Sequence, residues 1–120
     1  MADPTASEVR RVRAAGADQR KWARYPSSPQ TRCQVVIPDL GTEAMPGTIR
    51  NLSAGGISVL VGRRIPLGEL ANIHLENPSR HFACDVQLRV IYTIQDPSGD
   101  FLVGGPFDRE LSHDDLEKLL

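Results

Sequence analysis

Residues 81–93 read HFACDVQLRVIYT, and this stretch decides the fold. Apolar side chains occupy every second position from Phe82 to Tyr92, while charged residues such as Asp85 and Arg89 stand between them. Successive side chains of a β-strand point to opposite faces of the sheet. The alternation therefore predicts one long antiparallel strand with a single face in the hydrophobic core, on which Val90 and Tyr92 lie together.

The same period of two recurs along the rest of the chain. We expect further strands at residues 31–37, 47–52, 56–61, 69–76 and 101–107. Proline and glycine separate them, as in the loop at 38–46, the turn that begins at Asn77 and the hairpin at 95–100. Short strands in hairpin order predict a mainly all-β fold, a closed or nearly closed six-stranded antiparallel β-barrel. Closure would also remove exposed sheet edges.

A short C-terminal α-helix is expected to follow the last strand. Ser112 can cap its free N–H groups, and Asp114 and Asp115 place negative charge in the first turn, where the helix dipole favours it. Leu116 and Leu119 supply one apolar side for packing.

The chain begins with a segment of a different character. Residues 1–18 offer little apolar surface to bury, so we expect a flexible basic arm, followed by a barrel domain at residues 19–120 that opens with an extended loop. Residues 1–25 carry six basic and three acidic side chains, whereas residues 100–120 carry two basic and six acidic ones. The two ends could attract each other, or the basic end could mark an anion site, and charge alone leaves both open.

Composition bounds the class of protein. At 120 residues and 13.2 kDa, the chain has the size of one domain with a real core. Its formal net charge of −1 argues against a general binder of nucleic acid polymers. No stretch approaches the ~20 apolar residues that cross a bilayer, and the N-terminus lacks the apolar run of a secretory signal. We therefore expect a cytoplasmic protein without membrane insertion.

The sequence carries no sign of catalysis or of a bound metal. It contains no nucleophile elbow, phosphate loop or zinc-protease motif, so we expect neither an enzyme nor a cofactor. His74, His81 and Cys84 lack the paired short spacing of zinc ligands, and solvent-facing strand histidines explain the first two. Cys33 and Cys84 are interpreted as small core side chains rather than as a disulfide.

Two short motifs remain as candidates for binding. Residues 20–24 (RKWAR) place two arginines four apart in the loop before the first strand, and residues 51–56 (NLSAGG) lie at a strand–turn–strand junction. Two extended-chain arginines four apart lie roughly 13 Å from each other, and a curled loop would let both close on one compact anion. Arginine suits phosphate and the O6/N7 edge of guanine. Gly55 and Gly56 permit positive φ and a close approach to the backbone. Taken singly, solvated arginines and an ordinary hairpin turn explain each motif.

The combination is more specific than its parts. Arg-x-x-x-Arg before the first strand, then Asn-x-Ser-x-x-Gly about thirty residues later, resembles the two-part motif of the PilZ domain family of bacterial cyclic di-GMP receptors. Residues 67–68 (LG), 89–92 (RVIY) and 104–107 (GGPF) and the acidic helix are also similar to that family, so the resemblance covers roughly residues 19–120. The family implies a six-stranded antiparallel barrel with a C-terminal helix.

The resemblance also implies a ligand site. The implied cyclic di-GMP-binding residues are Arg20, Lys21, Arg24, Asn51, Ser53, Gly55 and Gly56. The arginines would hold the phosphates and the Hoogsteen edges of guanine and stack on the bases, while Asn51 and Ser53 would hydrogen-bond guanine from the barrel surface. Gly56 would keep the floor of the site open. Asn51 stands where Asp is frequent, Lys21 where a second arginine is common, and Trp22 is unusual in this loop.

The function implied is that of a cyclic di-GMP receptor domain. Ligand would order the arginine loop, and the change would be relayed to a downstream protein partner by a monomer or weak homodimer. The alternative is a degenerate PilZ-like barrel that binds no nucleotide and acts as a protein-interaction module. A barrel for single-stranded nucleic acid is disfavoured, because such a surface needs several aromatic residues on a basic face.

Overall fold

The computed structural model describes residues 25, 29–41 and 43–120. The expected flexible arm, residues 1–18, and the arginine-bearing segment with Arg20, Lys21, Trp22 and Arg24 lie outside these described residues. The elements are β1 (Arg32–Val36), η1 (Pro38–Leu40), β2 (Met45–Leu52), β3 (Gly56–Val61), β4 (Leu70–Asn77), η2 (Pro78–Arg80), β5 (Phe82–Arg89), β6 (Tyr92–Gln95), β7 (Phe101–Pro106) and α1 (His113–Leu119).

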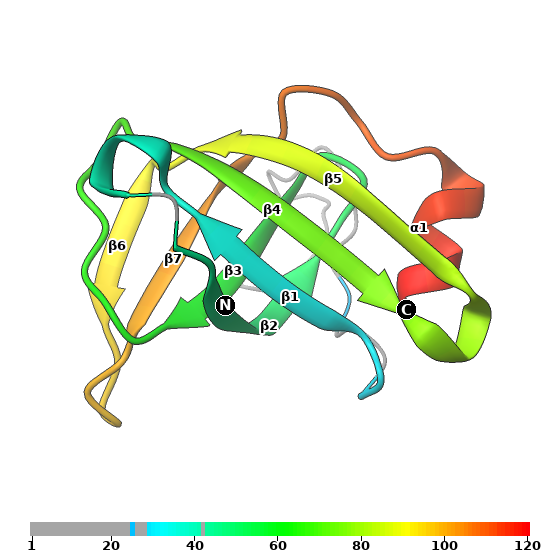
Figure 1. The fold of residues 1–120 in the computed structure, drawn as a ribbon, viewed down its shortest axis with the longest axis horizontal. Helices are drawn as coiled ribbons and strands as arrows, with labels where there is room; N and C mark the ends of the chain where they lie inside the picture. Colours follow the sequence, from blue (N-terminus) through cyan, green and yellow to red (C-terminus); the bar gives the residue numbers. More distant parts are fainter. Residues whose placement is uncertain (1–24, 26–28, 42) are drawn as a thin grey trace, which may run out of the picture.

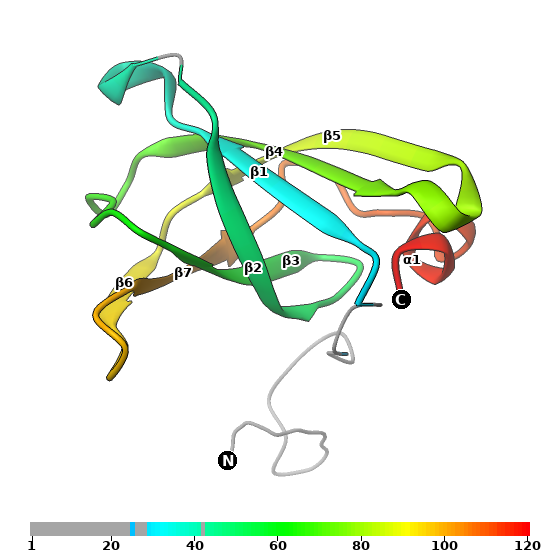
Figure 2. The same ribbon diagram turned by 60° about the horizontal axis from the view of Figure 1, so that its bottom comes forward.

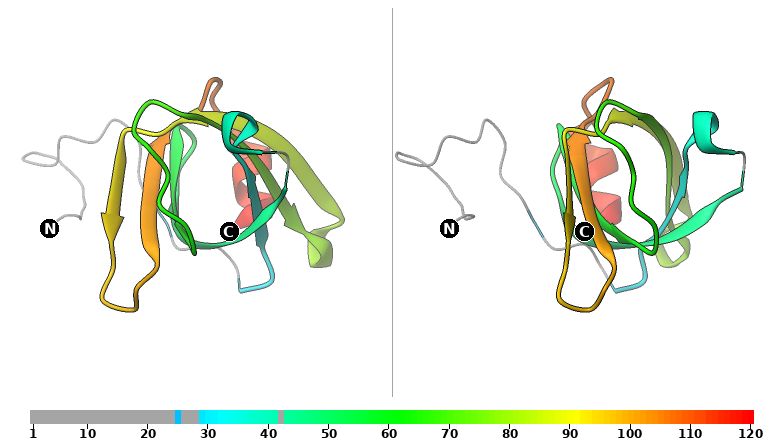
Figure 3. Two further views of the ribbon diagram at one scale, coloured as in Figure 1. Left: turned by 60° about the vertical axis from the view of Figure 1, so that its left-hand side comes forward. Right: turned by 90° about the vertical axis from the view of Figure 1, so that its left-hand side faces the viewer.

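All the strands belong to one antiparallel sheet in the order β5-β4-β1-β2-β3-β7-β6. The sheet curls on itself, as Figures 1 and 2 show, and in Figure 3 its strands surround a common interior. An isolated bridge between Leu88 and Phe107 brings β5 back toward the end of β7. The fold is therefore mainly β, a curled antiparallel sheet of barrel type, as the alternating pattern predicts.

The core lies inside the curl and follows from the period of two. The inward positions of neighbouring strands are buried, among them Val35, Val59, Ile73 and Leu88. Cys33 belongs to this core, and Cys84 is half-buried beside it, both as free thiols. These positions confirm the cysteines as small core side chains.

The long strand predicted at residues 81–93 is wrong in one respect, because it breaks at Val90 and Ile91 into β5 and β6. The carbonyl of Arg89 lies so close to Gly105 that a Cβ at Gly105 would overlap it. Beyond this contact the chain leaves β4, and the N–H of Ile91 donates to the carbonyl of Gly104 on β7 (2.9 Å). The described residues thus form seven strands instead of six.

The break also moves Tyr92 away from the core face on which the sequence pattern places it. Tyr92 pairs with Gly104, which in turn pairs with Ser58 on β3. The neighbours of Ser58 in β3, Ile57 and Val59, both point into the core. Since side chains alternate along a strand, Ser58, Gly104 and Tyr92 share the outer face of the sheet.

The turn after β4 differs slightly from the expected one. The strand continues through Asn77, which is almost fully buried, before the 3₁₀ turn η2. The side chain of Asn77 accepts from the N–H of Ser79 (3.2 Å) and donates to the carbonyl of Lys118 in α1 (2.8 Å). His81 ends the turn with φ 53°, so it is a left-handed turn residue and not the strand histidine expected.

The C-terminal helix follows the expected design. The Ser112 hydroxyl accepts from the N–H of Asp115 (3.1 Å), which confirms the predicted cap. Leu116 and Leu119 are buried, and the carbonyl of Leu119 accepts from the Thr31 hydroxyl before β1 (2.8 Å). In Figure 1, α1 lies beside the ends of β4 and β5. Within the described ranges no helix has the length and apolar character of a membrane span.

Candidate ligand-binding site

The turn between β2 and β3 is built around the side chain of Ser53. Its hydroxyl accepts from the N–H groups of Gly55 (3.3 Å) and Gly56 (3.1 Å) and lies 3.3 Å from the carbonyl of Gly56, to which it can donate. Ser53 is 6% exposed. A hydroxyl has one donor and two acceptor positions, so the turn already uses all three. The Ser53 hydroxyl therefore stabilises the turn through these hydrogen bonds and is not left free on the barrel surface.

Asn51 has the opposite character. It lies on β2 just past a register irregularity between Ile49 and Asn51, pairs with Ser58 on β3, and is half-buried. Within the described part of the chain its side-chain amide makes no hydrogen bond. An amide offers two donors and an acceptor, so Asn51 can receive a polar ligand without first releasing a protein partner.

Tyr25 brings the segment that follows the arginines to this turn. Its N–H donates to the carbonyl of Leu52 (2.9 Å), and the N–H of Leu52 donates to the carbonyl of Tyr25 (2.8 Å). Leu52 stands between Asn51 and Ser53 in the sequence. Tyr25 directly follows Arg24 in the sequence, so the bridge attaches the residue after the arginine motif to the turn motif.

Close packing, and not an unusual backbone angle, explains the glycine at position 56. The described glycines with positive φ are Gly41, Gly68 and Gly99, so the positive φ that glycine permits at positions 55 and 56 is not used in this turn. A Cβ at Gly56 would lie 2.6 Å from the carbonyl oxygen of Gly105 on β7. Glycine at position 56 thus lets β3 and β7 approach each other.

The C-terminal segment fixes the same turn from the other side. The carbonyl of Gly55 accepts from the N–H of Phe107 (2.8 Å), and the carbonyl of Ala54 accepts from the N–H of Leu111 (2.8 Å). The turn therefore receives backbone hydrogen bonds from Tyr25 on one side and from the segment that leads into α1 on the other. A displacement of the turn would therefore strain its hydrogen bonds to Tyr25, Phe107 and Leu111.

A row of residues crosses the outer face beside the turn, and the sequence pattern did not reveal it. Asn51 pairs with Ser58, Ser58 with Gly104, and Gly104 with Tyr92. The hydroxyls of Ser58 and Tyr92 are hydrogen-bonded to each other across the glycine. The pattern missed this row because it placed Tyr92 in the core, and because pairing across four strands is not visible in local periodicity.

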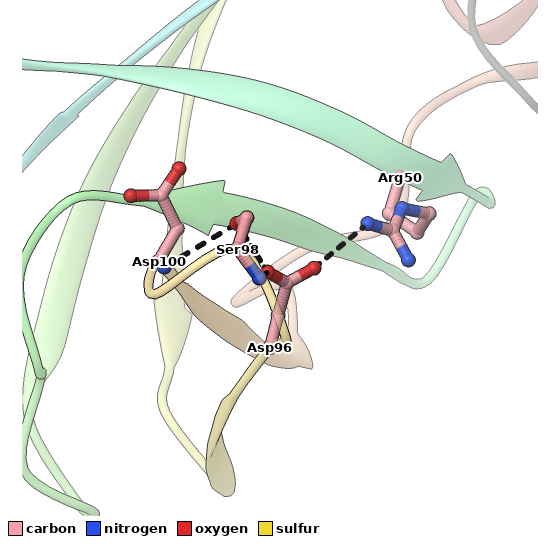
Figure 4. A network of polar contacts seen from close by, with 4 residues as sticks. All are labelled: Arg50, Asp96, Ser98 and Asp100. Atoms are coloured by element: carbon pink, nitrogen blue, oxygen red, sulfur yellow. Dashed lines mark hydrogen bonds and ion pairs between the residues drawn. The ribbon is translucent and has the colours of Figure 1, made fainter.

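Arg50, next to Asn51, is held by the hairpin between β6 and β7. Its guanidinium lies 3.5 Å from the carboxylate of Asp96, and Figure 4 shows the two side chains directed toward each other. Hydrogen bonds from the hydroxyl and N–H of Ser98, with a smaller contribution from Arg50, hold the pKa of Asp96 below its ordinary value. Asp96 is thus a carboxylate at neutral pH, and Arg50 is turned toward it.

Two surface hollows differ in charge. A groove of about 510 Å³ lies between β1 and β2, the strand that carries Asn51, and none of the described residues that line it is acidic. Its polar lining includes Arg32, Gln34 and Thr48. A second hollow of about 400 Å³ on β4 and β5 is lined by Asp85 and Asp108 among others. An anionic ligand is favoured by the first and repelled by the second.

Metal chemistry has no support from the described residues. No group of three or more histidine, cysteine, aspartate or glutamate side chains in them is placed to hold an ion. His74 instead lies 2.8 Å from the carboxylate of Asp85 on the neighbouring strand, where both are exposed to solvent.

One comparison with known proteins identifies a family. A family model described as "PilZ domain" matches residues 18–120. A comparison with curated protein sequences gave no significant match.

Solved structures with the same fold come from several bacteria. The structure of the inhibitor of motility MotI/DgrA of Bacillus subtilis aligns with TM-score 0.62 and 20% identity over 84% of this chain and 48% of that one. The structure of YcgR of Escherichia coli in complex with c-di-GMP aligns with TM-score 0.62 and 19% identity over 84% of this chain and 42% of that one. The MrkH–c-di-GMP complex of K. pneumonia aligns with TM-score 0.60 and 16% identity over 84% of this chain and 49% of that one. The chain thus spans about half the length of these structures.

Proposed function

The chain belongs to the PilZ domain family, and from this membership we propose that it is a receptor domain for cyclic di-GMP. Two structures of similar fold, YcgR and MrkH, are complexes with this ligand. Among the described residues, the side-chain amide of Asn51 has no partner and the lining of the groove between β1 and β2 has no acidic side chain. Both features support the same ligand class, an anion that carries hydrogen-bonding bases.

The proposed site closes from two sides. Arg20, Lys21 and Arg24 supply positive charge and the planar donors that suit phosphate and guanine edges. Asn51 offers its free amide from the barrel, and Ser53, Gly55 and Gly56 hold the turn in shape from beneath. Ser53 thereby acts on the ligand through the turn, which refines the direct contact that the resemblance implies.

The observation that carries the proposal is the bridge between Tyr25 and Leu52. A clamp needs its two halves within reach of each other, and this bridge joins the end of the arginine segment to the strand end between Asn51 and Ser53. Had Tyr25 paired on the far side of the barrel, the two motifs would not share a ligand.

We extend the proposal to signalling. Cyclic di-GMP brings two negative charges and two aromatic bases, and its binding would order the arginine segment over the turn. A ligand with higher affinity for the ordered state is sufficient to shift the population toward it. The ordered segment would then be read by a partner protein, with the domain acting without catalysis, in the cytoplasm, as a monomer or weak homodimer.

The test compares two arginines, Arg24 in the motif and Arg64 in the exposed loop after β3. Titration with cyclic di-GMP can be followed by the emission of Trp22, the only tryptophan of the chain, which lies inside the arginine segment. Arg24→Ala is expected to weaken binding by about 1–3 kcal/mol, the range for a lost bidentate guanine contact. This corresponds to roughly 5- to 150-fold in Kd.

Arg64→Ala is the matched control, because it removes the same charge from the chain at a position outside the motif. It is expected to bind within about twofold of the wild type. Equal affinities of a folded Arg24→Ala variant and the wild type would overturn the role of Arg24. Absence of any binding by the wild type would favour the alternative, a PilZ-type barrel that serves only as a protein-interaction module.

A further inference from the structure

We infer that Arg50 is a further ligand-binding residue, which exchanges the carboxylate of Asp96 for a phosphate of the ligand. This inference rests on the proposed function, since it adds a residue to the same site. It comes from an irregularity in β2 and from the hairpin between β6 and β7, and neither sequence motif includes Arg50 or Asp96.

A β-bulge in β2 directs Arg50 and Asn51 to the same face of the sheet. Ile49 pairs with Val59 of β3 and packs against the core, so the next side chain, that of Arg50, points outward. Asn51 would then point inward in a regular strand. It pairs instead with Ser58, the very next residue of β3, which belongs to the outer face. Arg50 is therefore the extra residue of the bulge, a feature that commonly re-aims side chains beside binding sites.

The ion pair that holds Arg50 is long and exposed. A guanidinium nitrogen lies 3.5 Å from the carboxylate of Asp96, and half of the Arg50 side chain is open to solvent. Within the described ranges of the chain, the guanidinium has no other ion-pair or hydrogen-bond partner. Exposed ion pairs contribute little to stability, because water screens them and two long side chains must be ordered. Arg50 can therefore leave Asp96 at low cost.

Asp96 keeps other partners when Arg50 leaves. Its carboxylate accepts from the N–H of Ser98 (2.7 Å) and from the hydroxyl of Ser98. The N–H of Asp100 in turn donates to that hydroxyl (3.4 Å), as Figure 4 shows. The bonds from Ser98 lower the pKa of Asp96 more than Arg50 does. Asp96 thus stays charged without Arg50, and it competes with any other anion for the guanidinium.

A phosphate suits the guanidinium of Arg50 better than Asp96 does. Guanidinium and phosphate form two parallel hydrogen bonds of about 2.7–2.9 Å, which are shorter than the contact to Asp96. Arg50 directly precedes Asn51, the residue proposed to bind a guanine edge. A ligand held at Asn51 therefore brings its two negative charges close to the flexible side chain of Arg50.

The experiment compares single changes of charge by titration with cyclic di-GMP. Arg50→Gln is expected to weaken binding roughly 5- to 50-fold, from the range for a hydrogen bond to a charged group. Asp96→Asn removes the competing carboxylate and keeps an acceptor for Ser98, so affinity is expected to rise about three- to fivefold. Asp100→Asn is the matched control, because it removes the same charge from the same hairpin. It is expected to stay within about 1.5-fold of the wild type, since exposed charges are screened.

Two further measurements separate the exchange from a general effect of charge. In the Arg50→Gln background, Asp96→Asn is expected to give no further gain. In the wild type, the NMR signal of the Asp96 carboxylate carbon is expected to shift when cyclic di-GMP saturates the chain, a readout that needs no variant to fold.

Three results would overturn the inference and leave the receptor function standing. These are a folded Arg50→Gln variant that binds as tightly as the wild type, an Asp96→Asn variant that binds no tighter than Asp100→Asn, and a saturated wild type with an unmoved Asp96 signal. A gain from Asp96→Asn that persists in the Arg50→Gln background would count against it equally. A wild type that does not bind cyclic di-GMP would overturn both the inference and the receptor function.

Discussion

At the scale of single residues, Cys33 links the stability of the barrel to alkaline pH. The side chain is 4% exposed in the core, and burial raises the pKa of its thiol from 9.0 to about 12. Between these values the folded chain keeps a proton that the unfolded chain releases. The contribution of the protonated Cys33 thiol to the free energy of unfolding is therefore complete below pH 9. It is lost as the pH rises from there toward the folded-state pKa.

This dependence can be measured by urea unfolding at pH 7 and pH 10. The thiol alone accounts for a loss of about 1 kcal/mol between these two conditions. Cys33→Ala lowers stability at both values, but the difference between pH 7 and pH 10 is expected to shrink by about that amount. Cys84→Ala, at the half-buried thiol, is the control. It is expected to reduce the difference in stability between pH 7 and pH 10 by less than Cys33→Ala does. If the free energy of unfolding changes equally with pH in the wild type and in Cys33→Ala, the raised pKa of Cys33 is contradicted.

The roles of single site residues were only partly visible in the sequence. The motif located the turn correctly, because residue types at fixed spacing identify a strand–turn–strand junction. The motif did not reveal that the Ser53 hydroxyl accepts hydrogen bonds from the N–H groups of Gly55 and Gly56, because these bonds depend on the geometry of the turn. Tyr92 was missed because its face is decided by a strand break that periodicity alone does not predict.

At the scale of elements, the approach of β3 to β7 depends on glycine. Gly56→Ala would place a Cβ 2.6 Å from the backbone oxygen of Gly105, which has no flexible side chain to move away. We expect a loss of about 1–3 kcal/mol in the free energy of unfolding, the usual cost of overpacking. The turn that carries Asn51 and Ser53 would shift with β3, so the affinity for cyclic di-GMP is expected to fall as well.

Gly62→Ala is the matched control for this prediction. It makes the same substitution in the loop just after β3, where nothing lies within 4 Å of the added Cβ. Its stability is expected to stay within about 0.5 kcal/mol of the wild type, as for other surface changes. The packing argument fails if chemical denaturation gives the same midpoint for both variants.

The strands themselves were predictable where the sheet is regular. Residues 56–61 place Ile57, Val59 and Val61 on one face and form β3 with the expected bounds. The break between β5 and β6 was not predictable, because the chain changes its partner there: Val90 still bonds to Glu69 before β4, whereas Ile91 donates to Gly104 on β7. The close approach of Arg89 to β7 depends on Gly105, far from the break in sequence, and local patterns carry no information about it.

At the scale of the whole molecule, the turn between β2 and β3 meets Tyr25 and the segment that leads into α1. Tyr25 pairs with Leu52, while Phe107 and Leu111 donate to the carbonyls of Gly55 and Ala54. Tyr25, the turn motif and the segment before α1 are thereby joined through backbone hydrogen bonds. A ligand bound at the turn thus has a short physical connection to the surface of the C-terminal helix.

The distribution of charge along the chain, and not the net charge, matters for an anionic ligand. The chain is nearly neutral overall, yet residues 1–25 carry twice as many basic as acidic side chains. Charge-assisted contacts between arginine and phosphate weaken as salt screens them. The affinity for a dianionic ligand is therefore expected to fall with rising salt, although the net charge alone would suggest little dependence.

The most direct test of the central claim is isothermal titration calorimetry of the 120-residue chain with cyclic di-GMP at low and high ionic strength. We expect saturable binding that weakens as salt is added and that disappears when Arg20 and Arg24 are both replaced by alanine. A folded wild-type chain that releases no heat of binding, or one whose affinity is the same at both salt concentrations, would contradict a clamp of arginines closed on the turn at Asn51.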